Sequence, residues 1–377
     1  MQIGIPRETK DGEQRIAVVP DGARMLVAAG HAVVVEAGAG AASGFADDAY
    51  RDAGATLADD AAMIWRCPLI VKVKEVQRAE YARLSRGTTI FGFAQLNRDR
   101  ALLNAVLAAG VRVIGFETVR DAHGALPLLA PMSRIAGRLA PLAGAQALMT
   151  NAGGNGTLVT GVDTVPGARV IVVGAGNVGG EAARVAARIG CDVTVFSRGA
   201  SRLAALAEND ERIETVVLAE DRTGLHDAIA RADLVICGVL EPGRLSPKLI
   251  PRDVVRAMRG GSAIVDVGID QGGIAETSRM TSLSQPTYVE EGVVHYAVPN
   301  MPALVARTAS LALAGAALPY VRKLSDVGIA HAVEQDAALA AGVMTWDGAI
   351  AHAGLAADAG EQVTAAPWRA GRVERVA

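Results

Sequence analysis

The stretch ARVIVVGAGNVGGEAARVAARIGCDVTVFSR, residues 168–198, determines the fold of the sequence around it. An apolar run at 170–173 leads into a glycine-rich turn, a helical pattern follows, and a second apolar run occupies 193–196. Strand, GxGxxG turn, helix and strand in this order are the setting in which the glycine motif binds a dinucleotide. We therefore predict a dinucleotide-binding βαβ unit here. The alternative is a glycine-rich packing turn in another kind of α/β protein.

Each glycine of this turn has a separate physical role. Gly174 allows the tight turn out of the strand, Gly176 lets the backbone approach a pyrophosphate, and Gly179 allows close helix–strand packing. The N–H groups and the positive end of the following helix then hold the pyrophosphate. The turn residues predicted to bind the cofactor are Gly174, Ala175, Gly176, Asn177, Val178 and Gly179.

The end of the second strand indicates which dinucleotide is bound. NAD-binding units usually carry Asp or Glu there, whereas an arginine accommodates the 2′-phosphate of NADP. Here the strand ends in Ser197 and Arg198, and Arg202 follows. A serine hydroxyl and an arginine can both bind a phosphate, so we predict that NADP(H) is preferred. In the alternative, Arg198 is a solvated loop cation and NAD(H) is used.

Length, composition and charge limit the kinds of protein this can be. A chain of 377 residues predicts two domains, and 51% hydrophobic with 20% charged residues is typical of a globular protein. A net charge of -3 without a basic stripe predicts no nucleic-acid partner. We find no signal peptide and no apolar run long enough to cross a bilayer, which predicts no membrane partner. The three cysteines are scattered, which predicts a reduced, cytoplasmic setting. Partners are then small molecules or further copies of the chain.

Short apolar runs alternate with helical patterns over most of the sequence. This alternation predicts an α/β fold with doubly wound parallel sheets, and a long alanine-rich helix at 135–150 bridges two domains. Strands are expected at 2–5, 31–36, 69–73, 89–93, 112–116, 215–218, 234–237 and 263–267, and further helices at 21–29, 47–54 and 304–324.

Basic residues near the first strands are candidates for binding an anion. Lys72 and Lys74 alternate with apolar residues at the end of a predicted strand, where open α/β sheets place their ligands, and Glu75 follows. Arg15 offers a fork that suits a carboxylate. The alternative is that these cations lie on the solvated surface.

Polar residues also follow the last predicted strands. Asp270 leaves an apolar strand beside two glycines and is the acid/base candidate, whereas Asp266 lies inside the strand and is expected to be held by hydrogen bonds. Asn300 could hold a carboxamide. Turn roles are the alternative for both Asp270 and Asn300. The histidines show no metal-ligand spacing, so we predict no metal.

Several segments together resemble the alanine dehydrogenase and pyridine nucleotide transhydrogenase N-terminal family. They are GIPRETKDGEQRIAVVP, VKVKE, FETV, ALPLLAPMSRIAGRLA, VIVVGAGNVGG, ADLVICGVLEPG, VDVGIDQGG and VPNMPA. ALPLLAPMS, IDQGG and NMPA resemble the alanine dehydrogenase branch. The resemblance implies a Rossmann-type dinucleotide-binding domain over 131–306, a discontinuous α/β substrate (catalytic) domain over 1–130 plus 307–377, a cleft between them, and a homo-oligomer, hexamer or dimer.

The resemblance also implies roles for individual residues. Arg15 and Lys74 match the residues that bind the substrate carboxylate and carbonyl, and Asp270 matches the catalytic aspartate. The family reaction is reversible oxidative deamination of an amino acid with a nicotinamide cofactor. By the same resemblance, the cofactor is contacted by Ser133, Val239, Leu240, Val267, Asp270 and Asn300.

Two residues depart from the family pattern. Gln95 stands where alanine dehydrogenases carry a catalytic histidine, and Ser197 stands where NAD-dependent members carry an aspartate. A neutral amide can orient a substrate but cannot take a proton near pH 7. Either Asp270 and Lys74 handle the protons and Gln95 positions the substrate, or the substrate differs.

We therefore predict an NADP-preferring oxidoreductase that acts on the CH–NH2 or C=N group of a small amino acid or imine. Two alternatives remain open at this point. One is an NADPH-dependent imine reductase that uses no free ammonia, and the other is a non-catalytic nucleotide-binding protein that resembles transhydrogenase domain I.

Overall fold

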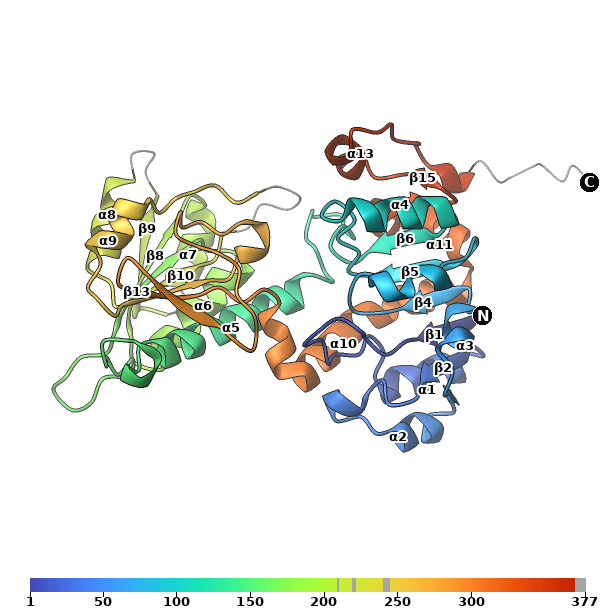
Figure 1. The fold of residues 1–377 in the computed structure, drawn as a ribbon, viewed down its shortest axis with the longest axis horizontal. Helices are drawn as coiled ribbons and strands as arrows, with labels where there is room; N and C mark the ends of the chain where they lie inside the picture. Colours follow the sequence, from blue (N-terminus) through green and yellow to red (C-terminus); the bar gives the residue numbers. More distant parts are fainter. Residues whose placement is uncertain (209, 219–221, 240–244, 370–377) are drawn as a thin grey trace, which may run out of the picture. The chain divides into compact units, whose positions relative to one another are not determined.

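The computed structural model describes residues 1–208, 210–218, 222–239 and 245–369 (Figure 1). The chain divides into two compact units. Unit 1 comprises Met1–Met132 and Ala303–Ala377, and unit 2 comprises Ser133–Pro302. Unit 1 is therefore assembled from both ends of the chain, and the predicted α/β fold with two domains is confirmed.

Unit 1 is built on an eight-stranded sheet within the described residues, in the order β15-β14-β6-β5-β4-β1-β2-β3. The strands from β1 to β6 are parallel, and the hairpin β14–β15 adds an antiparallel edge. Their bounds are β1 (Gln2–Ile5), β2 (Ala32–Glu36), β3 (Thr56–Ala58), β4 (Leu69–Val71), β5 (Thr89–Gly92), β6 (Arg112–Gly115), β14 (Val343–Trp346) and β15 (Ala349–Ile350).

Close packing in unit 1 depends on a glycine in its first strand. A Cβ on Gly4 would lie 2.6 Å from the backbone oxygen of Ile64, so only glycine lets helix α3 (Ala61–Trp65) approach β1 this closely. Ile70 and Ile90 continue the same apolar row across β4 and β5. The other helices of this unit are α1 (Pro20–Ala28), α2 (Asp47–Asp52), α4 (Arg100–Ala109), α10 (Ala306–Asp326), α11 (Ile329–Gln335), α12 (Ala337–Gly342) and α13 (Ala353–Ala359).

Unit 2 repeats the strand order of unit 1. Its sheet runs β12-β13-β11-β10-β7-β8-β9, so β9-β8-β7-β10-β11-β13 form a parallel set in the same order as β3-β2-β1-β4-β5-β6 of unit 1. Only the edge strand β12 is antiparallel among those described. The bounds are β7 (Arg169–Val173), β8 (Asp192–Ser197), β9 (Ile213–Val217), β10 (Leu234–Cys237), β11 (Ala263–Asp266), β12 (Thr287–Glu290) and β13 (Val293–Tyr296).

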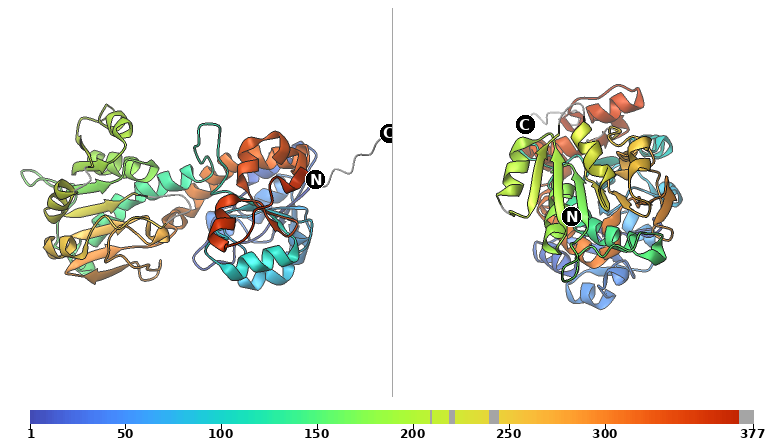
Figure 2. Two further views of the ribbon diagram at one scale, coloured as in Figure 1. Left: turned by 90° about the horizontal axis from the view of Figure 1, so that it is seen from above. Right: turned by 90° about the vertical axis from the view of Figure 1, so that its left-hand side faces the viewer.

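Helices cover both faces of this second sheet (Figures 1 and 2). Val170 and Val172 of β7 face an alanine-rich layer from α5 and α6, whereas Ile171 and Val173 face α8 and α9. Burial on both sides explains why these strands are continuous apolar runs instead of alternating ones. The bounds are α5 (Ala130–Ala147), α6 (Asn177–Arg188), α7 (Ala200–Ala207), α8 (Thr223–Ala230) and α9 (Arg252–Ala257).

The predicted strands match observed strands closely, but some elements differ. The long helix expected at 135–150 begins at Ala130, because Pro131 lies in its first turn, where a missing N–H costs no hydrogen bond. The strand expected to include Lys72 ends at Val71. Strands β3, β12, β14 and β15 and helices α3, α4, α11, α12 and α13 were not predicted.

One helical segment, Met301–Asp326, is long and apolar enough to cross a bilayer by length and composition. Half of its most apolar window is buried inside the protein, and core helices pass the same test. Length and composition alone therefore do not identify it as a membrane span.

Candidate functional site

The glycine-rich turn of unit 2 has the backbone geometry that its sequence predicts. Gly174 has φ of +103°, and a Cβ on Gly179 would lie 1.7 Å from the Gly174 oxygen, so neither position accepts a side chain. A Cβ on Gly176 would meet one side-chain atom within 4 Å, Nη1 of Arg202 at 3.9 Å. Helix α6 begins at Asn177 without a side-chain cap. The turn therefore leaves space and an uncapped helix N-terminus for a pyrophosphate, which fits a dinucleotide.

Cationic side chains stand beside this turn at the end of β8. Ser197 is the last residue of the strand and its Oγ accepts a hydrogen bond from the Gly199 backbone at 3.4 Å. Arg198 and Arg202 are exposed. Because Arg202 reaches toward Gly176 from α7, the turn has a positive charge at its open side.

The other residues predicted to bind the cofactor lie at further strand ends and loops of unit 2. Val239 and Val267 are partly exposed after β10 and β11, and Leu240 lies outside the described residues. Ser133 is partly exposed in the first turns of α5. Asn300 has φ of +62°, a left-handed conformation that asparagine tolerates better than most residues.

Asp270 lies in a short 3-10 helix directly after β11 and is partly exposed. The loop that carries it is anchored by Asp266, as the sequence predicts. The buried Asp266 accepts hydrogen bonds from the Ile274 backbone at 3.0 Å and from Ser278 Oγ at 2.6 Å. Burial raises the pKa of Asp266 above its ordinary value, against these hydrogen bonds. Asp266 thus holds the loop, and Asp270 remains the more accessible carboxylate.

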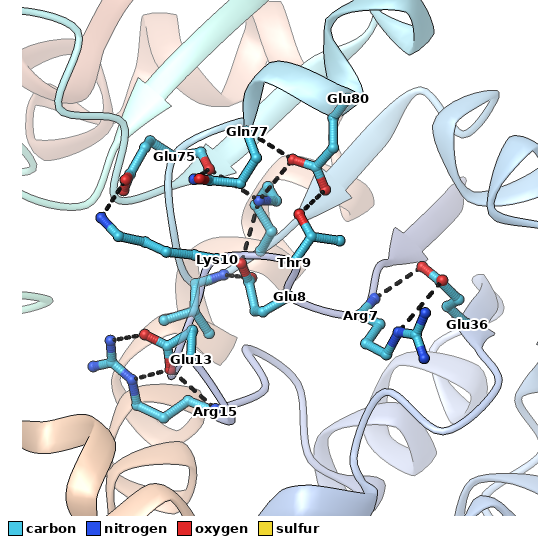
Figure 3. Close-up of polar contacts among 12 residues, drawn as sticks. Arg7, Glu8, Thr9, Lys10, Glu13, Arg15, Glu36, Glu75, Gln77 and Glu80 are labelled. Atoms are coloured by element: carbon cyan, nitrogen blue, oxygen red, sulfur yellow. Dashed lines mark hydrogen bonds and ion pairs between the residues drawn. The ribbon is translucent and has the colours of Figure 1, made fainter. Parts of the chain in front are cut away.

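In unit 1, Arg15 is buried and forms a two-pronged ion pair with Glu13 (Figure 3). Its Nε lies 2.7 Å from Glu13 Oε1, and its Nη2 lies 2.5 Å from Oε2. The third nitrogen, Nη1, contacts the sulfur of Met132 at 3.1 Å. The fork expected to bind a substrate carboxylate therefore holds a protein carboxylate, while Nη1 faces a weak acceptor.

Lys72 and Lys74 are both buried, so neither lies on the solvated surface. The Nζ of Lys72 lies 3.2 Å from Glu8 and 3.4 Å from Glu80, so this lysine has a structural role. Burial alone lowers the pKa of Lys72, but the charges of Glu8 and Glu80 outweigh this and raise it. The expectation that both lysines are anion-binding candidates is thus wrong for Lys72.

Lys74, Gln95 and Glu117 form a cluster at the carboxyl ends of three adjacent strands, β4, β5 and β6. The Glu117 carboxylate accepts hydrogen bonds from the backbones of Gln95, at 2.7 Å, and Ala94, at 3.1 Å. Burial raises the pKa of Glu117, while these hydrogen bonds and the charge of Lys74 act in the opposite direction. Gln95 has φ of +46°, an uncommon conformation for this residue type.

Sequence reasoning missed two carboxylates of these sites, Glu13 and Glu117. Glu13 could have been found because it precedes Arg15 by two residues, a spacing at which a bidentate pair is possible. Glu117 belongs to the quoted segment FETV, but its partners lie in the loop after another strand, β5, so only the sheet order reveals them. Within the described ranges, no group of three or more His, Cys, Asp or Glu residues could hold a metal ion.

Comparison with known proteins places this geometry in a family. The family model "Alanine dehydrogenase/PNT, N-terminal domain" matches residues 4–136, and the model "Alanine dehydrogenase/PNT, C-terminal domain" matches 140–353. The chain belongs to the alanine dehydrogenase/PNT family. It is an enzyme, an oxidoreductase of alanine dehydrogenase type that uses a nicotinamide cofactor and a small-molecule substrate.

Individual relatives of this family member match over almost the whole chain. The alanine dehydrogenase of Halomonas elongata is 46% identical over 94% of this chain and 96% of the relative, and that of Bacillus subtilis is 41% identical over 96% and 95%. A solved L-alanine dehydrogenase has a TM-score of 0.92 at 42% identity and covers 96% of this chain and 99% of its own. A transhydrogenase from Sinorhizobium meliloti has a TM-score of 0.79 at 25% identity, over 94% and 99%.

Proposed function

We propose that this protein catalyses the reversible oxidative deamination of a small amino acid to its 2-oxo acid, with NADP(H) as the preferred cofactor. The observation that carries the proposal is the cluster of Lys74 and Gln95 at adjacent strand ends, in a chain that also has the glycine turn of a dinucleotide-binding unit. Ligands of open α/β sheets bind at these carboxyl ends.

The chain offers a carboxylate site at Arg15. Glu13 fixes the guanidinium through Nε and Nη2, and Nη1 contacts the Met132 sulfur. Because a thioether is a weak acceptor, a substrate carboxylate is a much better partner for Nη1. Arg15 would then bind the carboxylate that all amino acid and 2-oxo acid substrates share.

The remaining chemistry is divided among three residues. The nicotinamide, when bound, accepts a hydride from the substrate Cα or returns one. Lys74 donates a hydrogen bond to the carbonyl or imine, and Asp270 takes and returns the proton of the attacking water. Gln95 orients the substrate by hydrogen bonds, because an amide does not titrate near pH 7.

Preference for NADP(H) is supported by charge. The strand β8 ends in Ser197 instead of a carboxylate, and the Arg202 guanidinium approaches Gly176. A 2′-phosphate finds hydrogen-bond donors and positive charge there, whereas an aspartate would repel it. We propose that Ser197, Arg198 and Arg202 bind this phosphate.

The direct test is oxidation of NADPH and of NADH in the presence of pyruvate and ammonium, followed by other 2-oxo acids. Turnover with a 2-oxo acid that requires ammonium and is faster with NADPH is expected. No turnover with any 2-oxo acid, with either cofactor, would remove the deamination proposal.

Gln95 favours a second candidate, an imine reductase that uses no free ammonia. Forming an imine from ammonium and a ketone needs more proton transfers than reducing one, and Gln95 supplies none. This candidate predicts NADPH oxidation with a preformed cyclic imine but none with a 2-oxo acid and ammonium.

We also propose that the enzyme works as a homo-oligomer, a hexamer or a dimer, in the cytoplasm. Large apolar side chains are exposed in unit 2, and the three cysteines are buried free thiols, as expected in a reducing compartment. Light scattering on the full chain gives the subunit number; a monomer at micromolar concentration would contradict self-association. The exposed apolar side chains of unit 2 include Leu142, Met149, Leu158, Val162 and Val165.

A further inference from the structure

The cluster at the ends of β4, β5 and β6 contains one carboxylate, Glu117, that the proposed reaction does not use. Both of its oxygens lie within hydrogen-bond distance of the Ala94 backbone nitrogen, at 3.1 and 3.2 Å, and Oε1 also accepts from Gln95 at 2.7 Å. One carboxylate thus binds two consecutive backbone N–H groups. These N–H groups belong to Gln95, which is expected to orient the substrate, and to its neighbour Ala94.

The backbone of Gln95 needs this support. Its φ of +46° lies in the left-handed region, which residues other than glycine rarely adopt and which persists only where neighbouring contacts enforce it. The bond from Gln95 N to Glu117 is such a contact, because it forms only while the Gln95 amide points at the Glu117 carboxylate. Release of this bond allows the Gln95 backbone to relax and its side chain to move.

We propose that Glu117 is a positioning residue for the reaction, which holds the Gln95 backbone in its left-handed conformation. The inference rests on the proposed function only in the role of Gln95. The hold on the backbone is independent of which substrate the enzyme uses.

Glu117→Gln tests this role. The amide oxygen of the variant can still accept from both N–H groups, as Oε1 does in the wild type, but both hydrogen bonds lose the negative charge that strengthens them. We expect kcat to fall about 10- to 100-fold, as a small misplacement at a reaction centre does, with a smaller change in KM. Glu117→Asp, which keeps a carboxylate, should retain more of the wild-type kcat than Glu117→Gln does.

Glu36→Gln is the matched control. Glu36 also ends a strand of this sheet and accepts a backbone hydrogen bond, from Arg7 at 3.0 Å, but it contacts neither Lys74 nor Gln95 in the part of the chain that the structure describes. Its kinetic constants should match those of the wild type. An unchanged kcat in Glu117→Gln, or an equal loss in the control, would overturn the proposal.

Hydrogen exchange separates this inference from the proposed function. In Glu117→Gln, the Ala94 and Gln95 amides should exchange at least about tenfold faster than in the wild type, whereas the Glu36→Gln variant should leave them protected. If the wild-type protein shows no turnover but Glu117→Gln still shows faster exchange, the proposed reaction is rejected and the hold on the backbone is kept. Unchanged exchange at both amides would reject the positioning role even in an active enzyme.

Discussion

Arg15 and Glu13 form a buried ion pair in which two guanidinium nitrogens meet two carboxylate oxygens at 2.7 and 2.5 Å. Both side chains are almost fully buried, at 1% and 0% exposure. Such a pair orients the guanidinium within narrow limits, because the planar fork allows one bidentate geometry. The residue proposed to bind the substrate carboxylate is thus oriented by another protein side chain.

Glu13→Ala should destabilise the protein and weaken substrate binding. Removing one partner takes away the carboxylate that pairs with the buried Arg15 charge, which costs about 3–5 kcal/mol of unfolding free energy. Urea unfolding measures this loss, and steady-state kinetics should show a raised KM for the 2-oxo acid. Glu361→Ala, which removes a half-exposed ion pair with Arg100, is the control and should change both quantities little. A variant of Glu13 as stable as this control would contradict the prediction.

Arg202→Ala and Arg198→Ala should lower the affinity for NADPH much more than the affinity for NADH. Each variant removes a charge-assisted hydrogen bond of about 1.5–3 kcal/mol to the 2′-phosphate, roughly a 10- to 100-fold loss. Ser197→Asp should shift the preference toward NADH by repelling the phosphate. Titration of each variant with both reduced cofactors by calorimetry measures the ratio. Equal losses of affinity for the two cofactors would mean that these arginines do not bind the 2′-phosphate.

Two glycines of the turn should respond to alanine in opposite ways. Gly179→Ala places a methyl group 1.7 Å from the Gly174 oxygen and should prevent normal folding of unit 2. Among the described residues, Gly176→Ala meets only the Arg202 guanidinium within 4 Å, at 3.9 Å, so its melting temperature should remain close to that of the wild type. Its affinity for both cofactors should nevertheless fall, because the added methyl group occupies the side where the pyrophosphate would lie. Unimpaired cofactor binding by folded Gly176→Ala would argue against a pyrophosphate at this turn.

Gln95→His should increase amino acid oxidation if the amide limits proton transfer. Histidine titrates near pH 6.5 and tolerates the left-handed φ of +46° at this position better than most residues. We expect L-alanine oxidation to rise and the pH profile to gain a limb near the histidine pKa. Gln95→Asn, which keeps an amide, is the control and should show neither change. If Gln95→His loses activity on every substrate, Gln95 has a role that a histidine cannot take over.

The sequence alone determined the local structure of this protein. The apolar runs at 170–173 and 193–196 form β7 and β8, because strands buried on both faces carry apolar residues at successive positions. The glycine turn could also be predicted from the sequence, because local backbone geometry requires the glycines at Gly174 and Gly179, which are within a few residues of each other. Short or weakly patterned strands such as β3 and β15 gave no such signal.

Only the tertiary structure decided which polar residues act together. Lys72 and Lys74 look alike in the sequence. In the structure, Lys72 pairs with Glu8, which is distant in the sequence, and with Glu80, which lies on a separate turn. Glu117 reaches Gln95 because β6 lies beside β5 in the sheet, and this neighbourhood is set by the order of parallel strands. Local propensities fix where a strand begins and ends; the packing of strands and helices over the whole unit fixes which strand ends become neighbours, and with them the partners of each buried charge.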